Sequence, residues 1–201
     1  RGLAGGYNSN ITRMIIDEGF TKENTVVYAV GKKGRELLER KGYEIKADYS
    51  EAINDPIYKD AKEICDDVLS AFADGEVGEI YLAYTVFKNT VVHEPQLIRL
   101  LPVEADDAAH ETDGSEALMT YEPSEEEALD MIIPKYVCSL VYGALIESVA
   151  SENGARMQAM DSATSNAEEM ISTLSLKYNR ARQASITQEL TEIIAGANAI
   201  E

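Results

Sequence analysis

Three glycines within the first six residues could, by their type and spacing, bind a phosphate group. The stretch Arg1–Asn10 reads RGLAGGYNSN, so the glycines precede asparagine and serine residues that favour a helix start. A dinucleotide-binding loop requires G-x-G-x-x-G after a strand, and the spacing of Gly2, Gly5 and Gly6 does not match it. The stretch is also typical of the tight turn of an α/β unit whose first strand lies upstream, and we interpret it in this way.

The other candidate residues form no catalytic arrangement. Gly31 and Gly34 flank two lysines but lack the G-x-x-x-x-G-K-[ST] pattern of the second kind of phosphate loop. Neither His93 nor His110 has the serine or cysteine arrangement of a nucleophilic site around it. We expect His93 to be structural and His110 to be solvated. The sequence therefore predicts no catalytic residue, no cofactor site and no metal site.

Acidic residues crowd one stretch near the middle of the chain. Six carboxylates lie between Glu104 and Glu116, and no lysine or arginine occurs between Arg99 and Lys135. A calcium-binding loop needs ligands at alternating positions and a glutamate as the last ligand. The residues that follow Asp113 do not have this pattern. We expect a solvated surface loop.

The overall composition excludes several classes of partner. The chain has 201 residues, 45% of them hydrophobic, and a formal net charge of −18, which disfavours nonspecific binding to nucleic acid or anionic lipid. No run of about eighteen apolar residues occurs, so no direct insertion into a membrane is expected. Cys65 and Cys138 are isolated, as in reduced cytosolic proteins.

Strand and helix signals alternate over residues 1–121 and predict an α/β domain with a Rossmann-like mixed sheet whose first strand is missing. A helix capped by Asn8 or Asn10 should run to about Glu18, and Pro56 should open another helix at its first position. Pro95 favours an edge strand or a bulge. The remaining expected elements are strands at 25–30 and 43–45, helices at 32–41 and 55–73, and a hairpin of 79–87 with 91–101.

Residues 122–201 are predicted to form one very long C-terminal helix. Ser124 is its cap, and Glu127 closes a capping box. No credible stop follows, since Pro134 should bend the helix rather than end it. A helix from Ser124 to Ile200 would be about 110 Å long, so it must project from a protein of this size.

The apolar side of this helix has the spacing of a coiled coil. Residues repeat at intervals of three and four, but small or adaptable side chains neighbour them. We expect a partner helix upstream of Arg1 or on another subunit. The stripe contains Ala167, Ile171, Leu174, Tyr178, Ala181, Ile186, Leu190, Ile193, Ala197 and Ile200.

Three basic residues lie within two turns of this helix in an otherwise acidic protein. Arg180 and Arg182 are about 200° apart around a helix, so they cannot serve one flat surface. Together with Lys177, they suit a rod surrounded by partner surface, and the alternative is that both guanidinium groups are simply solvated.

Two other classes of protein remain open from these residues alone. One is a nucleotide-binding α/β protein with a coiled-coil oligomerisation arm, which would bind NAD or ATP. The other is a structural or signalling coiled coil, since Ser151–Ser175 is rich in alanine, serine, glutamate and methionine. It predicts that residues 124–201 associate into parallel homodimers.

Several stretches resemble one known family. The sequence Tyr178–Ile193, YNRARQASITQELTEI, is similar to the C-terminal signature of the gamma subunit of the rotary F-type ATP synthase, and the opening glycine turn resembles that family's turn after its first strand. Further matches occur in order along the chain, at TVFKNT with EP (85–90, 94–95), YEPS (121–124), IPKY (133–136) and SENGARMQAM (151–160). Gamma subunits begin with a long N-terminal helix and a first strand, so this chain is expected to be a fragment.

The resemblance implies the role of central shaft, which couples ion-driven rotation of the membrane ring to ATP synthesis or hydrolysis on the beta subunits. It also implies that the long C-terminal helix forms half of an antiparallel coiled coil with the N-terminal helix of the same subunit. The implied partners are the alpha and beta subunits of the catalytic ring, the epsilon subunit and the membrane c-ring. The subunit itself would carry no catalytic side chain. The cysteines do not match the dithiol insert of plant-type gammas, which favours a peripheral subunit at the cytoplasmic face of a bacterial membrane.

The resemblance also implies which residues bind partners. Arg182 and Gln183 match a pair that hydrogen-bonds a loop of one beta subunit, and Lys177 and Arg180 are expected to contact acidic parts of the beta subunits. The apolar tip, which includes Ile193, Ile194 and Ile200, would turn within the upper sleeve of the ring.

Overall fold

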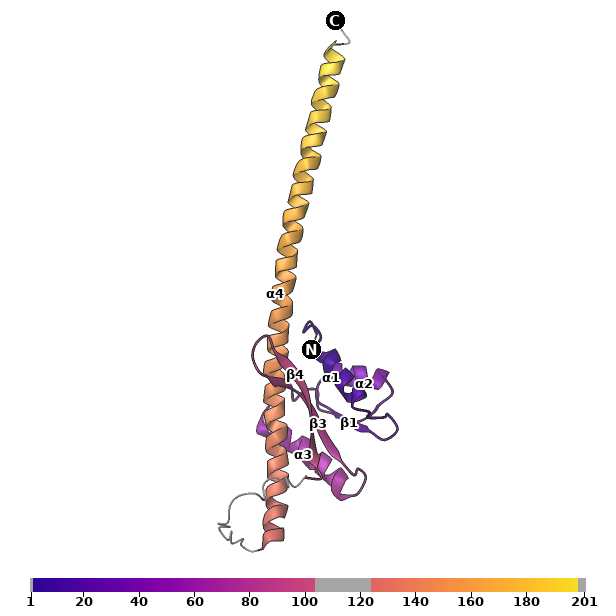
Figure 1. Ribbon diagram of the computed structural model, residues 1–201, viewed down its shortest axis with the longest axis vertical. Helices are drawn as coiled ribbons and strands as arrows, with labels where there is room; N and C mark the ends of the chain where they lie inside the picture. The colour runs from indigo at the N-terminus through magenta and orange to yellow at the C-terminus, as the bar shows by residue number, and fades with distance from the viewer. Residues whose placement is uncertain (1, 104–123, 199–201) are drawn as a thin grey trace, which may run out of the picture. The chain divides into compact units, whose positions relative to one another are not determined.

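A computed structural model describes residues 2–103 and 124–198 of the chain, which divides into two compact units, 1–158 and 159–201. The boundary predicted between residues 121 and 122, the acidic stretch and His110 lie outside the described residues. The elements are α1 (Tyr7–Asp17), β1 (Val26–Ala29), α2 (Lys32–Arg40), β2 (Glu44–Asp48), α3 (Tyr58–Ala73), β3 (Ile80–Phe87), β4 (His93–Leu101) and α4 (Glu125–Asn198) (Figure 1).

The strands form two separate pairs within the described residues. β1 and β2 are parallel, with α2 as the crossover between them, whereas β3 and β4 form an antiparallel hairpin. The predicted α/β class with parallel and antiparallel parts is confirmed. However, these pairs do not hydrogen-bond to each other, so the single mixed sheet expected from the sequence is here two small sheets.

Some helix ends are determined by capping residues and glycines close to them in the sequence. Gly19 and Gly42 have positive φ of 84° and 89° just after α1 and α2, as their positions in the sequence predict. Glu127 N donates to Ser124 Oγ at 3.2 Å, which confirms the cap of α4. Pro134 lies inside this helix without ending it.

Two predicted helix starts are wrong. α1 begins after Gly6, so Asn8 and Asn10 lie within the helix rather than at its cap. The turn at Gly5, with φ of 56°, already directs the chain into the helix, so no side-chain cap is needed there. α3 begins after Ile57, whose backbone N–H donates to Asp60 Oδ2 at 3.0 Å, so Pro56 precedes the helix instead of opening it.

The hairpin confirms the edge interpretation of Pro95. This proline lies in β4 opposite Thr85, and β4 pairs on one side only within the described residues. The irregularity in strand register lies between Ile80 and Tyr81, away from the proline.

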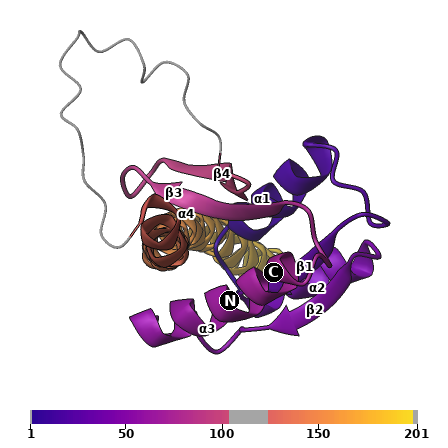
Figure 2. The same ribbon diagram turned by 90° about the horizontal axis from the view of Figure 1, so that it is seen from below.

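The core lies where the first half of α4 packs between α3 and the β3–β4 hairpin (Figure 2). Buried residues of α4 recur at intervals of one, three and four and so line one side of the helix. They meet Ala61 and Ile64 of α3 and Leu100 of β4. The buried residues of α4 in this contact are Val137, Cys138, Val141 and Leu145.

The same helix contains one window with the length and composition of a membrane span. Within 127–198, eighteen residues reach a mean hydropathy of 1.5, and 28% of that window is buried. Core helices of globular proteins meet this criterion too, and Val137 and Val141 belong to the core described above. The criterion is weak evidence for a membrane span, and the expectation of no direct insertion stays a prediction.

Two leucines of α4 provide a matched test of this packing. Leu145 is 6% exposed and Leu174 is 63% exposed. We expect Leu145→Ala to lower the free energy of unfolding of the isolated chain by roughly 2–5 kcal/mol, because it removes buried methyl groups and leaves a cavity. Leu174→Ala should change it by less than about 0.5 kcal/mol. Urea unfolding followed by circular dichroism measures both, and equal effects would contradict this assignment of the core.

Candidate functional site: the exposed surface of α4

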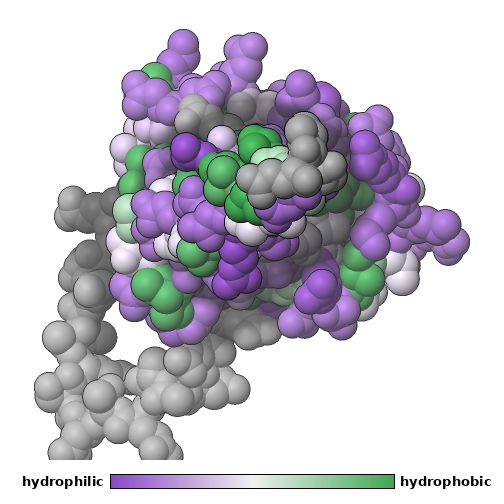
Figure 3. All heavy atoms as spheres, turned by 90° about the horizontal axis from the view of Figure 1, so that it is seen from above, coloured by the Kyte–Doolittle hydropathy of each residue, from purple (hydrophilic) through white to green (hydrophobic). Residues whose placement is uncertain are grey.

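Residues 159–198 form a helix that buries almost nothing within this chain. Every described residue from 160 to 198 is exposed, including large apolar ones. Ile171, Tyr178 and Ile193 are 64%, 67% and 68% exposed. Apolar and polar residues both reach the surface in the view from the C-terminal end (Figure 3). An apolar surface of this extent marks an interaction site.

Local interactions alone do not explain a helix of this length. Thr187 Oγ1 donates to the carbonyl of Gln183 at 2.8 Å, and Gln188 Nε2 donates to Glu192 Oε1 at 2.9 Å. Side-chain pairs of the second kind contribute only about 0.2–0.5 kcal/mol each. Most helix stability in proteins comes from packing of an apolar face, so this surface requires a partner.

The structure places the predicted partner-binding residues along this helix. Lys177, Arg180, Arg182 and Gln183 are all exposed. The two arginines point in different directions around the axis, because residues two apart differ by about 200°. These four residues are therefore available to a partner that surrounds the helix rather than to one flat face.

The apolar end of the helix is described only in part. Ile193 and Ile194 are 68% and 60% exposed, so both are accessible to a partner. Ile200 lies outside the described residues.

The glycine turn at the start of the chain serves backbone geometry. Gly5 has a positive φ of 56°, which most other residues adopt at a cost. At Gly6 a Cβ would already lie 3.4 Å from the Asn10 side chain. This confirms the interpretation of the stretch as a turn into a helix.

The remaining candidate residues belong to packed regions. His93 stacks on Phe87 with ring centroids 5.9 Å apart, which agrees with the structural role expected for it. Cys65 and Cys138 are both free and buried in the core. Over residues 2–103 and 124–198, no three side chains of histidine, cysteine, aspartate or glutamate are grouped as metal ligands.

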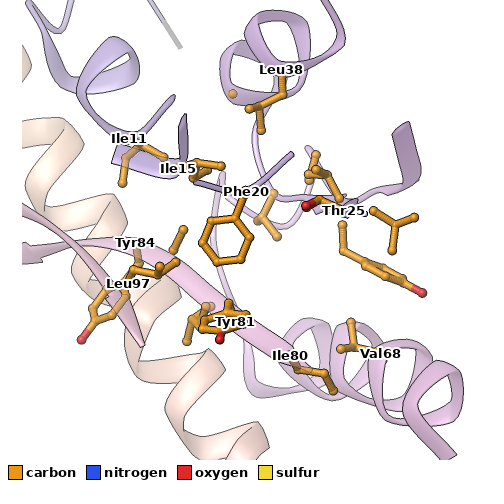
Figure 4. Close-up of a pocket in the computed structure, with 18 of the residues that line it drawn as sticks. Ile11, Ile15, Phe20, Thr25, Leu38, Val68, Ile80, Tyr81, Tyr84 and Leu97 are labelled. Carbon is orange, nitrogen blue, oxygen red and sulfur yellow. The ribbon is translucent and has the colours of Figure 1, made fainter. Parts of the chain in front are cut away.

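A cavity of about 900 Å³ lies in the first unit, lined by the facing edges of β1 and β3 and by residues from the surrounding helices. Its lining is mainly apolar, and Phe20 and Tyr81 meet edge to face there with centroids 4.9 Å apart. The side chains labelled in Figure 4 are Ile11, Ile15, Phe20, Thr25, Leu38, Val68, Ile80, Tyr81, Tyr84 and Leu97.

The basic residues at the α2 side of this cavity are already paired. Lys33 Nζ lies 2.7 Å from Glu36 Oε2, and Arg35 forms an ion pair with Asp48. Hydrogen bonds from Ser50, with the charge of Arg35, hold the pKa of Asp48 below its ordinary value. This side of the cavity therefore lacks the free cationic groups that would favour a nucleotide phosphate.

These features are typical of a subunit of a larger assembly: a small α/β unit, and a long helix whose second part exposes its apolar side chains. The family model described as ATP synthase matches residues 1–200. The chain is 68% identical to the ATP synthase gamma chain of Lachnoclostridium phytofermentans over 206 aligned residues, covering all of this chain and 71% of the relative. It is 43% identical to the sodium ion specific ATP synthase gamma chain of Acetobacterium woodii, of which it covers 72%.

A solved structure agrees with the sequence relatives. A chain of the central stalk and c-ring of the Tetrahymena thermophila mitochondrial ATP synthase matches 82% of this chain. The match covers 72% of that chain, with a TM-score of 0.61 and 27% identity. The chain therefore belongs to the family of ATP synthase gamma chains, the central-stalk subunits of F-type ATP synthases. Gamma is a non-catalytic subunit of the peripheral F1 part of a membrane complex, and the catalytic sites lie on the beta subunits.

Sequence reasoning missed two features of the first unit. The cavity depends on which elements face each other, and no local pattern encodes that. The contact between Gly154 and His93 was missed too, although a glycine inside a helical pattern is a recognised signal of close approach.

The buried thiol of Cys65 predicts how the free energy of unfolding changes with pH. Burial, with the neighbouring Cys138 thiol, raises the pKa of the Cys65 thiol to about 12. An unfolded thiol titrates near pH 8.5, so the unfolded state loses this proton first as the pH rises. The contribution of this thiol to the free energy of unfolding is fully present below about pH 8.5 and decreases as the pH rises above that value. We expect the free energy of unfolding to fall by about 2 kcal/mol more between pH 8 and pH 10 in the wild type than in Cys65→Ala.

Urea unfolding in the presence of a reductant at the two pH values measures this difference. Equal losses in the two proteins would contradict a protonated, buried thiol at this position.

Proposed function

We propose that this chain acts as the rotor shaft of its ATP synthase and couples ion-driven rotation of the membrane ring to ATP synthesis or hydrolysis on the beta subunits. One observation carries the proposal: from residue 160 to residue 198 α4 exposes every side chain, apolar ones included. Such a helix can be covered by a partner helix and by a surrounding ring at once.

The apolar stripe supports an antiparallel coiled coil with a second helix of the same subunit. Ile171, Leu174 and Tyr178 are spaced by three and four and are all more than 60% exposed. The small and adaptable neighbours of this stripe suit a surface that must slide past other subunits, because closely interdigitated side chains resist sliding.

The polar residues suit contacts with the catalytic ring. Arg182 and Gln183 would hydrogen-bond a loop of one beta subunit, and Lys177 and Arg180 would meet acidic parts of the beta subunits. The exposed Ile193 and Ile194 would turn, with Ile200, in an apolar sleeve formed by the alpha and beta subunits.

The first unit would lie toward the epsilon subunit and the c-ring. The relatives described above include bacterial gamma chains, which supports a place at the cytoplasmic face of a bacterial cell membrane, as a peripheral subunit.

The contact with the beta subunit can be tested in the assembled complex. We expect Arg182→Ala and Gln183→Ala each to weaken assembly or coupling. Loss of the hydrogen bond costs roughly 1.5–3 kcal/mol for the charged arginine and about 0.5–1.5 kcal/mol for the neutral amide of the glutamine. The measurements are the yield of intact complex and the ratio of ATP synthesis to hydrolysis. Gln188→Ala is the control, because this side chain already bonds to Glu192 on its own helix. Wild-type assembly and synthesis in the Arg182/Gln183 double variant would overturn the assignment.

The cavity supports a further proposal, that a β-strand of the complete subunit lies between β1 and β3. Each of these strands is hydrogen-bonded on one side only within the described residues, and the apolar cavity lies between their open edges. Residues 26–29 and 80–85 line it. The strand expected upstream of residue 1 would pair with both edges and join the two small sheets into one mixed sheet.

Hydrogen exchange distinguishes this arrangement from an open cavity. In a longer polypeptide that includes the upstream segment, the backbone amides of β1 and β3 that face the cavity should exchange more slowly than in this chain, because a paired strand edge protects them. Amides of β4, which lies on the far side of β3, serve as the control. Equal exchange of β1 and β3 in both polypeptides would contradict the proposal.

A further inference from the structure

Three residues of α4 at intervals of three meet the rest of the first unit through their backbone or a small side chain. The Tyr7 hydroxyl donates to the carbonyl of Ser148 at 2.9 Å, and Ser151 Oγ donates to the carbonyl of Thr85 at 3.1 Å. Gly154 is the third residue, and His93 lies against it. Residues three apart are neighbours on one helix face, so α1, β3 and β4 all contact the same face of α4.

Gly154 allows an unusually close approach. A Cβ at this position would lie 2.7 Å from His93 Cε1 and 3.4 Å from Phe87 Cε2. A glycine inside a helix costs about 1 kcal/mol relative to alanine, so its presence here is explained by the room it leaves for the imidazole ring. Gly143, in the same helix, has nothing within 4 Å of an added Cβ.

The end of the hairpin that holds this ring is stiffened by its own contacts. Phe87 and His93 are opposite each other in the β3–β4 register and stack at an interplanar angle of 26°. Asn89 Oδ1 accepts hydrogen bonds from the backbone N–H groups of Val91 at 2.9 Å and Val92 at 2.7 Å. Both ring nitrogens of His93 are enclosed. The ring therefore has little freedom to move aside if Gly154 gains a side chain.

The hydrogen bonds make the contact directional. Ser151 is completely buried, and its hydroxyl reaches the Thr85 carbonyl only when this face of α4 is turned toward β3. Glu152, 6% exposed, forms an ion pair with Arg156 one turn further along. Apolar contacts alone are non-directional and would tolerate a small rotation of the helix. The buried Ser151 hydroxyl and the close fit of Gly154 to the His93 ring would not tolerate such a rotation.

We propose that these residues form a register contact, Tyr7, Thr85, Phe87 and His93 against Ser148, Ser151 and Gly154, that fixes the rotational setting of α4 in the α/β unit and transmits torque between them. The inference rests on the rotor function proposed above. Every described residue beyond Ala159 is exposed, so this contact lies within two turns of the last point along α4 at which the α/β unit can resist a twist of the helix.

The two glycines of α4 provide a matched pair of variants. Gly154→Ala and Gly143→Ala raise helix propensity equally, but only the first places a methyl group against His93. The double variant Gly154→Ala/His93→Ala removes the ring that the methyl group meets. Ser151→Ala removes the hydroxyl without adding bulk.

The experiment uses the complete enzyme with the C-terminal end of α4 cross-linked to the surrounding ring and a bead attached to the exposed side of α2. The angular fluctuation of the bead reports the torsional compliance between the α/β unit and the fixed end of the helix. We expect Gly154→Ala to raise the angular variance by roughly twofold or more, because the added methyl group pushes the His93 ring away and loosens the closely packed contact that resists a twist of the helix. Gly143→Ala should match the wild type, and the double variant should return toward it.

Several outcomes decide the proposal. Equal variance in the Gly154→Ala and Gly143→Ala enzymes would overturn it, even if Gly154→Ala lowers thermal stability, since a merely structural role changes stability without changing compliance. If Gly154→Ala fails to assemble, Ser151→Ala takes its place, and an unchanged variance in that enzyme overturns the proposal as well. If the wild-type enzyme without the cross-link does not rotate its bead when ATP is added, the proposed rotor function fails instead.

Discussion

The property on which the rest of the structure depends is that α4 continues far beyond the residues that can cover it. The helix has 74 residues, and those from 160 to 198 are exposed throughout. A single helix with Ile171 and Ile193 open to water is not an independently stable unit, because helix stability in water comes mainly from packing of its apolar face. The second unit therefore has its natural state only inside an assembly, and membership of the gamma chain family supplies one.

The two parts of α4 differ in what their sequences can pack against. In the first part, Val137, Val141 and Leu145 recur at intervals of four and are buried against α3 and the hairpin. In the second part, Ile171 and Leu174 keep a similar spacing but have serine, threonine and alanine neighbours. The first pattern suits a permanent core, whereas the second suits a narrow contact with another helix.

Local chemistry explains which features could be predicted from the sequence. The cap at Ser124 and the hairpin each depend on residues close together in the chain, and both are confirmed. The helix starts at Asn8 and Pro56 were wrong by a few residues, because the turn at Gly5 and the Asp60 carboxylate direct the chain first. The separation of the two strand pairs and the cavity between them depend on tertiary arrangement, which no short pattern records. The partner contacts of Arg182 and Gln183 came from resemblance alone and stay predictions.

A rotor that transmits torque needs opposite kinds of packing at its two ends. Where the helix joins its own α/β unit, slippage loses work, so directional and closely fitted contacts are favoured, such as the Ser151 hydroxyl on Thr85 and the His93 ring on Gly154. Under the proposed function the helix turns inside other subunits, and there the same fit would hold it still. Exposed small residues along residues 160–198 would avoid deep interdigitation, and basic residues on different sides would allow the proposed contacts to form and break as the helix turns. The change from buried to exposed residues near Gln158 thus corresponds to a change in mechanical requirement along one continuous helix.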